Sequence, residues 1–108
     1  MAYRVYGAVV EEESGKPLPG LLVRAYDKDL IRDDHLGDAR TDVDGAFALT
    51  FTEVQFKDFN ETLPDLYVRV YDASGKHVLY TTEKTPRSNT FLNERFDIRI
   101  PRAKLAAR

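Results

Sequence analysis

The chain has 108 residues, of which 43% are hydrophobic and 31% are charged, a composition that indicates one folded domain. Sixteen basic and eighteen acidic side chains leave a net charge of −2, which gives no electrostatic basis for binding nucleic acid. No apolar run is long enough for a membrane span, so membrane insertion is not expected. The lack of cysteine excludes disulfides, thiolate metal sites and a cysteine nucleophile.

The two ends of the sequence set the expected limits of the domain. Met1 and Ala2 lead directly into a strand-like run, and no signal peptide is visible. This start predicts a cytoplasmic protein, export by a signal-free route, or excision from a larger protein. Pro101 cannot donate to a sheet ladder and is expected to end the last strand. We therefore expect a β-sandwich over residues 1–101 and a basic C-terminal tail or linker over residues 102–108.

Short runs of aromatic and β-branched residues, separated by turn residues, predict about seven strands. In chain order the runs cover residues 5–10, 21–27, 36–41, 46–52, 66–72, 78–82 and 93–100. Tight hairpin turns are expected at Gly45 and Gly75, because glycine readily takes the positive φ that such turns need. One short helix is expected near residues 52–59, where Thr52 can cap the first turn.

The runs alternate between apolar and polar residues. In the fourth run, for example, Phe47, Leu49 and Phe51 share one face and smaller residues occupy the other. A period of two with one apolar face predicts antiparallel sheets that pack around a shared core. The expected fold class is therefore an all-β sandwich.

Three motifs in the first half of the chain resemble a known family. They are Val5-x-Gly7-x-Val9, Gly15-Lys16-Pro17-Leu18-Pro19-Gly20-Leu21-x-Val23-x-Ala25, and Thr41-Asp42-x-Asp44-Gly45-x-Phe47. Together they are similar to the carboxypeptidase regulatory-like, or transthyretin-like, domain family, with the best match over residues 5–51. The resemblance implies a seven-stranded, antiparallel Greek-key sandwich. It also implies an accessory module beside catalytic, toxin, secretion-spike or surface domains, usually without catalysis of its own.

Two groups of enzymes with related sandwiches need residues that this sequence does not supply. Hydroxyisourate hydrolases carry catalytic histidines and end in a Tyr-Arg-Gly-Ser signature, whereas this chain ends in Leu-Ala-Ala-Arg. Intradiol dioxygenases bind iron through two tyrosines and two closely spaced histidines. The histidines here, His35 and His77, lie on separate segments, so we predict that the chain is not an enzyme.

Residues 27–44 are rich in aspartate. Clustered carboxylates on loops can supply the oxygen ligands that Ca²⁺ prefers, so this segment is a candidate calcium site. The alternative interpretation is a solvated loop in which aspartates serve turn and cap roles, and it is the favoured one. The candidate ligands are Asp27, Asp29, Asp33 and Asp34.

A second candidate is a face of tyrosine and arginine side chains on two of the expected strands. If those strands pair, they form a stripe of the residue types enriched at binding hot spots. A protein contact is favoured over a sugar site because the chain lacks tryptophan. The alternative is that arginine stacks on tyrosine only for local stability. The candidate binding residues are Arg24, Tyr26, Tyr67, Arg69 and Tyr71.

These observations predict a non-catalytic accessory or adaptor module whose partner is another protein or a covalently linked neighbouring domain. Such a module would serve a larger bacterial surface, toxin or secretion-spike assembly. The alternative is a calcium- or carbohydrate-binding module that uses the loop 27–44 and the tyrosine face. A homodimer that forms by pairing of edge strands is a further alternative.

Overall fold

The computed structural model describes residues 2–56, 63–88 and 90–106. The described chain forms strands and two short helices, in the order β1 (Ala2–Glu11), β2 (Leu22–Asp27), β3 (Asp34–Arg40), β4 (Ala46–Thr52), α1 (Glu53–Phe56), β5 (Leu66–Tyr71), β6 (Val78–Thr81), β7 (Asn93–Ile100) and α2 (Arg102–Ala106). Each run predicted from the sequence overlaps one of these strands. None of the helices described is long and apolar enough to cross a membrane.

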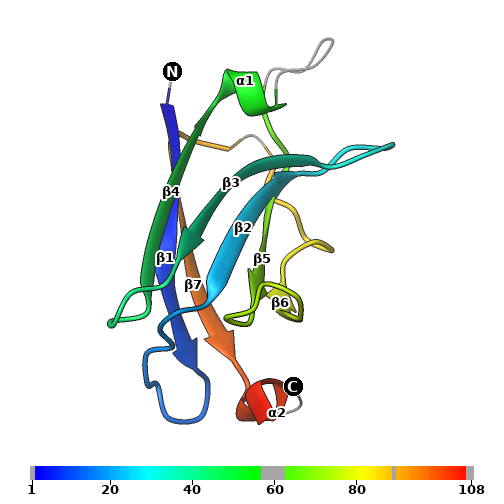
Figure 1. Ribbon diagram of the computed structural model, residues 1–108. Coiled ribbons are helices and arrows are strands. Elements are labelled where there is room, and N and C mark those ends of the chain that lie inside the picture. Colours follow the sequence, from blue (N-terminus) through cyan, green and yellow to red (C-terminus); the bar gives the residue numbers. More distant parts are fainter. Residues whose placement is uncertain (1, 57–62, 89, 107–108) are drawn as a thin grey trace.

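The strands form two sheets, with the orders β4-β1-β7 and β3-β2-β5-β6 (Figure 1). The prediction of an all-β sandwich is confirmed at this level. The prediction that every pairing is antiparallel is wrong at one place, because β1 and β7 run parallel. A period of two assigns the faces of a strand but not its direction, so the sequence pattern could not show this.

The core lies between the two sheets and follows the predicted alternation. The four-stranded sheet contributes Val23, Ala25, Val68 and Val70, all fully buried. The other sheet faces them with the aromatic and aliphatic residues Val5, Val9, Phe47, Leu49, Phe51, Phe96, Ile98 and Ile100. This arrangement turns the opposite faces of β2 and β5 outward, and their side chains form the candidate site.

Gly7 explains why β1 and β7 can lie so close together. A Cβ atom at this position would lie 1.8 Å from the carbonyl oxygen of Phe96, which is far inside the contact distance. Gly7 and Phe96 are register partners in the parallel ladder. The close approach of β7 therefore explains why position 7, in the first of the three motifs, is a glycine.

The two helices differ from the expected elements. Helix α1 covers Glu53–Phe56, which is shorter than the predicted helix, and residues 57–59 of that prediction lie outside the described residues. Phe56 is buried and packs edge-on against Tyr3 and Phe51. Helix α2 lies within the predicted tail, and its Leu105 packs against the core, so this part of the tail rests on the sandwich.

Candidate functional site

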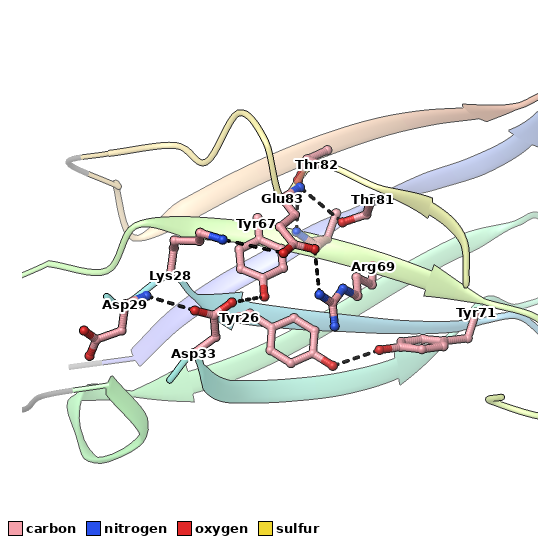
Figure 2. A network of polar contacts seen from close by, with 11 residues as sticks. Tyr26, Lys28, Asp29, Asp33, Tyr67, Arg69, Tyr71, Thr81, Thr82 and Glu83 are labelled. Carbon is pink, nitrogen blue, oxygen red and sulfur yellow. Dashed lines mark hydrogen bonds and ion pairs between the residues drawn. The ribbon is translucent and has the colours of Figure 1, made fainter. Parts of the chain in front are cut away.

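The candidate site lies on the outer face of the four-stranded sheet, where β2 and β5 pair. The register places Arg24 opposite Arg69 and Tyr26 opposite Tyr67. The predicted binding residues therefore do come together, and each of these two pairs joins residues more than forty positions apart along the chain. Figure 2 shows Tyr26, Tyr67, Arg69 and Tyr71 with the charged residues around them.

The tyrosines of this face contact one another directly. The rings of Tyr26 and Tyr67 stack with centroids 5.1 Å apart and an interplanar angle of 16°. The phenol oxygens of Tyr26 and Tyr71 lie 2.9 Å apart, within hydrogen-bonding distance. The guanidinium of Arg69 lies over both stacked rings, 5.1 Å from Tyr26 and 5.6 Å from Tyr67. Stacking and cation–π contact thus join the two strands.

The tyrosine face is less exposed than the sequence suggested. Tyr67 is only 1% exposed and Tyr71 only 8%, so neither ring is available to a partner. The expectation of an accessible aromatic stripe is therefore wrong at these two positions. The Tyr26 ring and the cations of Arg69 and Lys28 lie against Tyr67, and the Arg24 guanidinium lies over Tyr71, which sequence alternation alone does not reveal.

Glu83, which the sequence analysis did not single out, neutralises two of the cations. Its Oε1 accepts a hydrogen bond of 2.6 Å from Arg69, and its Oε2 lies 3.5 Å from the Lys28 ammonium. The hydrogen bond from Arg69 holds the pKa of Glu83 below its ordinary value and raises that of Arg69. Strand β6 ends at Thr81, and Glu83 follows two positions later. The sequence could have indicated that Glu83 shares a face with Thr81 only if the alternation of β6 were extended past the end of the strand.

Asp33 is the link between this face and the β2–β3 loop, residues 28–33. The phenol of Tyr67 donates a hydrogen bond to its Oδ2, and the backbone amide of Asp29 donates another of 3.0 Å to its Oδ1. Partial burial raises the pKa of Asp33, but the bonds from Tyr67 and Asp29 outweigh this effect and the net pKa is lowered. Burial and the bond to Asp33 raise the pKa of Tyr67. Asp33 is therefore held as a carboxylate by a neutral phenol.

The other predicted calcium ligands have separate structural roles. Asp27 is fully buried, and its Oδ1 accepts a bond of 2.8 Å from the amide of Asp65. Asp29 accepts a bond of 2.6 Å from the amide of Leu30, and Asp34 begins β3. Within residues 2–56, 63–88 and 90–106, no group of three or more His, Asp or Glu side chains is placed to hold a metal. Calcium binding stays the alternative to the favoured interpretation of a solvated loop.

The two histidines lie on separate elements. His35 is on β3, where its Nε2 and the Nε of Arg24 share one oxygen of Asp38, at 2.6 and 3.1 Å. His77 precedes β6, and its carbonyl accepts the amide of Asp72 across the β5–β6 turn. Both positions fit the sequence-based expectation that the histidines occupy different segments.

The tip of the β2–β3 loop was not anticipated from the sequence. Leu30 and Ile31 are completely exposed, at 102% and 97% of the reference area. Their loop projects from the sheet well beyond the ends of its neighbours (Figure 1, cyan). Below the tip, the Asp33–Tyr67 bond and the bond of 2.9 Å from the Lys28 amide to the Asp65 carbonyl fix both arms of the loop. We call Leu30 and Ile31, with these supports, the braced tip.

Comparison with known proteins gives a fold but no family. No family model matches the chain, and no curated protein matches it. Among solved structures, the crystal structure of a 9R-lipoxygenase from Cyanothece PCC8801 is similar, with a TM-score of 0.69 and 19% sequence identity. The similarity covers 93% of this chain but only 16% of the lipoxygenase chain. At this identity the comparison supports the fold alone, and the transthyretin-like resemblance stays a prediction.

Proposed function

We propose that the chain is a non-catalytic accessory module of the transthyretin-like, Greek-key class that docks onto another protein or a neighbouring domain through its braced tip. The observation that carries this proposal is the complete exposure of Leu30 and Ile31 on a loop whose arms are bonded to the sheet. The proposed partner surface is an apolar pocket that accepts these two side chains.

Burial of the tip would supply a useful binding free energy. Transfer of two such aliphatic side chains out of water is worth about 3–6 kcal/mol in total. Association also costs free energy when flexible groups become ordered, and a loop that is already ordered reduces this cost. Because Tyr67 and Asp65 hold the loop before any partner arrives, the structure favours docking by a pre-organised tip.

The charges around the tip favour a protein pocket over a lipid surface. Asp29, Asp33 and Asp34 lie beside the tip, whereas the cations of the same stretch are Lys28, which is paired with Glu83, and Arg32. An anionic membrane would repel this excess of carboxylates. A protein pocket with a basic or mixed rim would complement it.

The structural comparison supports the idea of an accessory role without establishing it. The similar region accounts for 16% of the lipoxygenase chain, so in that protein a fold of this kind is one part of a larger polypeptide. A module of this type needs a contact surface toward the rest of its assembly. The braced tip is the surface that we assign to this purpose.

The proposal can be tested by placing a photocrosslinking amino acid at position 30, with the same amino acid at position 43 as the control. Val43 is a similarly exposed aliphatic residue, 82% accessible, on the β3–β4 turn. In extracts of the source cells, position 30 should give one discrete adduct that position 43 does not give. The yield should fall when Tyr67→Phe removes the brace. Equal adduct patterns at the two positions would contradict docking through the tip.

A further inference from the structure

A second feature of the molecule is opposite to the braced tip in charge and shares its apolar character. It is a groove of about 460 Å³ at the side of the sandwich where β6 and the end of β7 lie next to each other. Both strands are the outermost members of their sheets in the part of the chain that the structure describes. The groove is lined by Glu12, Val78, Leu79, Tyr80, Thr81, Arg99, Pro101 and Lys104.

The lining of this groove suits an aliphatic ligand with carboxylates beside it. Val78, Tyr80 and Pro101 supply apolar surface, and Val78 is half exposed although it is a large aliphatic residue. Two cations, Arg99 and Lys104, and one anion, Glu12, surround that surface. An apolar occupant that carries more carboxylates than cations would complement it in both polarity and charge.

The braced tip has this combination of groups. It presents Leu30 and Ile31 in a stretch, residues 29–34, that holds the three carboxylates of Asp29, Asp33 and Asp34 against one cation, Arg32. We infer that the braced tip of one molecule inserts into the β6–β7 groove of a second copy of this chain. This inference rests on the proposed function, because it names the partner of the same tip.

The arrangement must be between molecules. Leu30 and Ile31 are completely exposed, so a molecule's own tip does not fill its own groove. In Figure 1 the tip projects away from the end of the sandwich that carries α2, while the groove includes Lys104 of α2. Where one tip of a pair is inserted, the contact is heterologous and leaves one tip and one groove free. Further copies can therefore add in the same way.

The contact is small, because it consists of one loop tip in one groove. Small contacts of this kind are typical of weak and transient complexes. We therefore expect self-association that grows with protein concentration rather than a permanent dimer. It should weaken as salt is added, because part of the complementarity is between exposed charges.

Sedimentation velocity of the intact chain, measured from about 10 μM to about 1 mM, tests the inference over the range expected for weak association. The average mass of the wild-type chain should rise with concentration. Ile31→Asp should abolish the rise, since it places a charge in an apolar groove. Val43→Asp, which changes a similarly exposed aliphatic residue outside the tip, should leave the rise intact.

A mixing experiment distinguishes this heterologous contact from pairing through edge strands. Val78→Asp damages the groove but keeps the tip, whereas Ile31→Asp damages the tip but keeps the groove. Each variant alone should be monomeric, and an equimolar mixture should form one-to-one dimers that grow no further. Circular dichroism of both variants at the wild-type level shows that the loss of association is not a loss of folding.

Three results would overturn the inference. A wild-type chain that stays monomeric at about 1 mM lacks even the weak association expected of so small a contact. Association that survives Ile31→Asp uses another surface, such as an edge strand. If the chain does not self-associate but binds phosphatidylcholine vesicles, and Ile31→Asp abolishes that binding, the tip contacts lipid instead. In the first two cases a position-30 adduct with a different protein would still support docking, so the second-copy inference and the proposed function can fail separately.

Discussion

The two connections that flank β3 are built in different ways. In the β3–β4 turn, residues 41–45, Asp42 Oδ1 accepts the amides of Asp44 and Ala46, both at 2.9 Å. The ends of the turn are bonded to more distant segments, since the Thr41 amide donates to Leu21 and the Gly45 carbonyl accepts the amide of Val9. The β2–β3 loop is held by Tyr67 and Asp65, which lie more than thirty positions away along the chain. Each connection exposes an aliphatic side chain, but only the loop depends on a bond donated by a side chain of another strand, that of Tyr67 to Asp33.

The largest expected effect is on the β3–β4 turn. Gly45 has φ +73°, and a Cβ there would lie 2.5 Å from the carbonyl oxygen of Val9. Gly45→Ala should therefore lower the free energy of unfolding by about 3 kcal/mol, through both backbone strain and the clash. Gly75→Ala is the matched control, because φ is +77° there but the nearest atom is a side-chain carbon of Leu22 at 3.3 Å. Equal losses in urea unfolding of the two variants would show that the close approach to Val9 does not matter.

The next effect concerns the brace of the loop. Tyr67→Phe removes the hydroxyl that donates to Asp33 and should lower the free energy of unfolding by about 1.5 kcal/mol. Tyr71→Phe removes a hydroxyl from the same face, but that hydroxyl bonds to Tyr26 and not to the loop. Limited proteolysis should therefore cleave the β2–β3 loop faster in the Tyr67 variant alone. Equal cleavage of both variants would mean that Tyr67 does not hold the loop.

The pattern of these contacts shows how far the sequence could be read. The turn at residues 41–45 was predictable because the Asp42 bonds at its centre connect neighbours, and the alternation of Phe47, Leu49 and Phe51 correctly assigned the core face of β4. The sequence predicted that Tyr26 and Tyr67 share a face only if β2 and β5 pair. The two strands do pair, and the two tyrosines are register partners.

The rest depended on contacts between distant segments. The burial of Tyr67 depends on side chains from a distant part of the chain, among them Tyr26 and Lys28, and no local pattern encodes that. Leu30 and Ile31 stand next to each other between charged residues, outside any alternating run, so their exposure could not be inferred from periodicity. The parallel direction of β7 depends on the path of the connection before it, which the faces of the strand do not specify.

The bond between Tyr67 and Asp33 should also make the stability depend on pH. This change in the free energy of unfolding should be smaller than the loss that Tyr67→Phe causes at neutral pH. The folded-state pKa of Asp33 lies below its ordinary value of 3.8, so its stabilising contribution is complete above that value and is lost as the pH falls toward the folded-state pKa. The stability difference between the wild type and Tyr67→Phe should therefore shrink below about pH 4, by no more than about 1 kcal/mol. Urea unfolding of both proteins from pH 7 to pH 3 measures it. A difference that grows on acidification would contradict the assignment of Asp33 as the acceptor.

The smallest expected effect is that of calcium. Asp27 is buried against the amide of Asp65, and Asp33 is bonded by Tyr67, so neither carboxylate faces an open site shared with the others. We expect the melting temperature to be the same in EDTA and in a calcium series, with magnesium as the control. A ligand that binds only the folded state must raise the melting temperature. A saturable rise with calcium alone would restore the aspartate-rich segment as a metal site.

The central claim is that the Tyr67 side chain holds the loop whereas the Asp42 side chain shapes the centre of the turn, and amide hydrogen exchange tests it most directly. Reporters in the loop are the amides of Lys28 and Asp29, and reporters in the turn are those of Asp44 and Ala46. Tyr67→Phe should speed exchange in the loop and leave the turn unchanged, and Asp42→Ala should do the reverse. Loop amides that exchange at the wild-type rate in Tyr67→Phe would contradict the account.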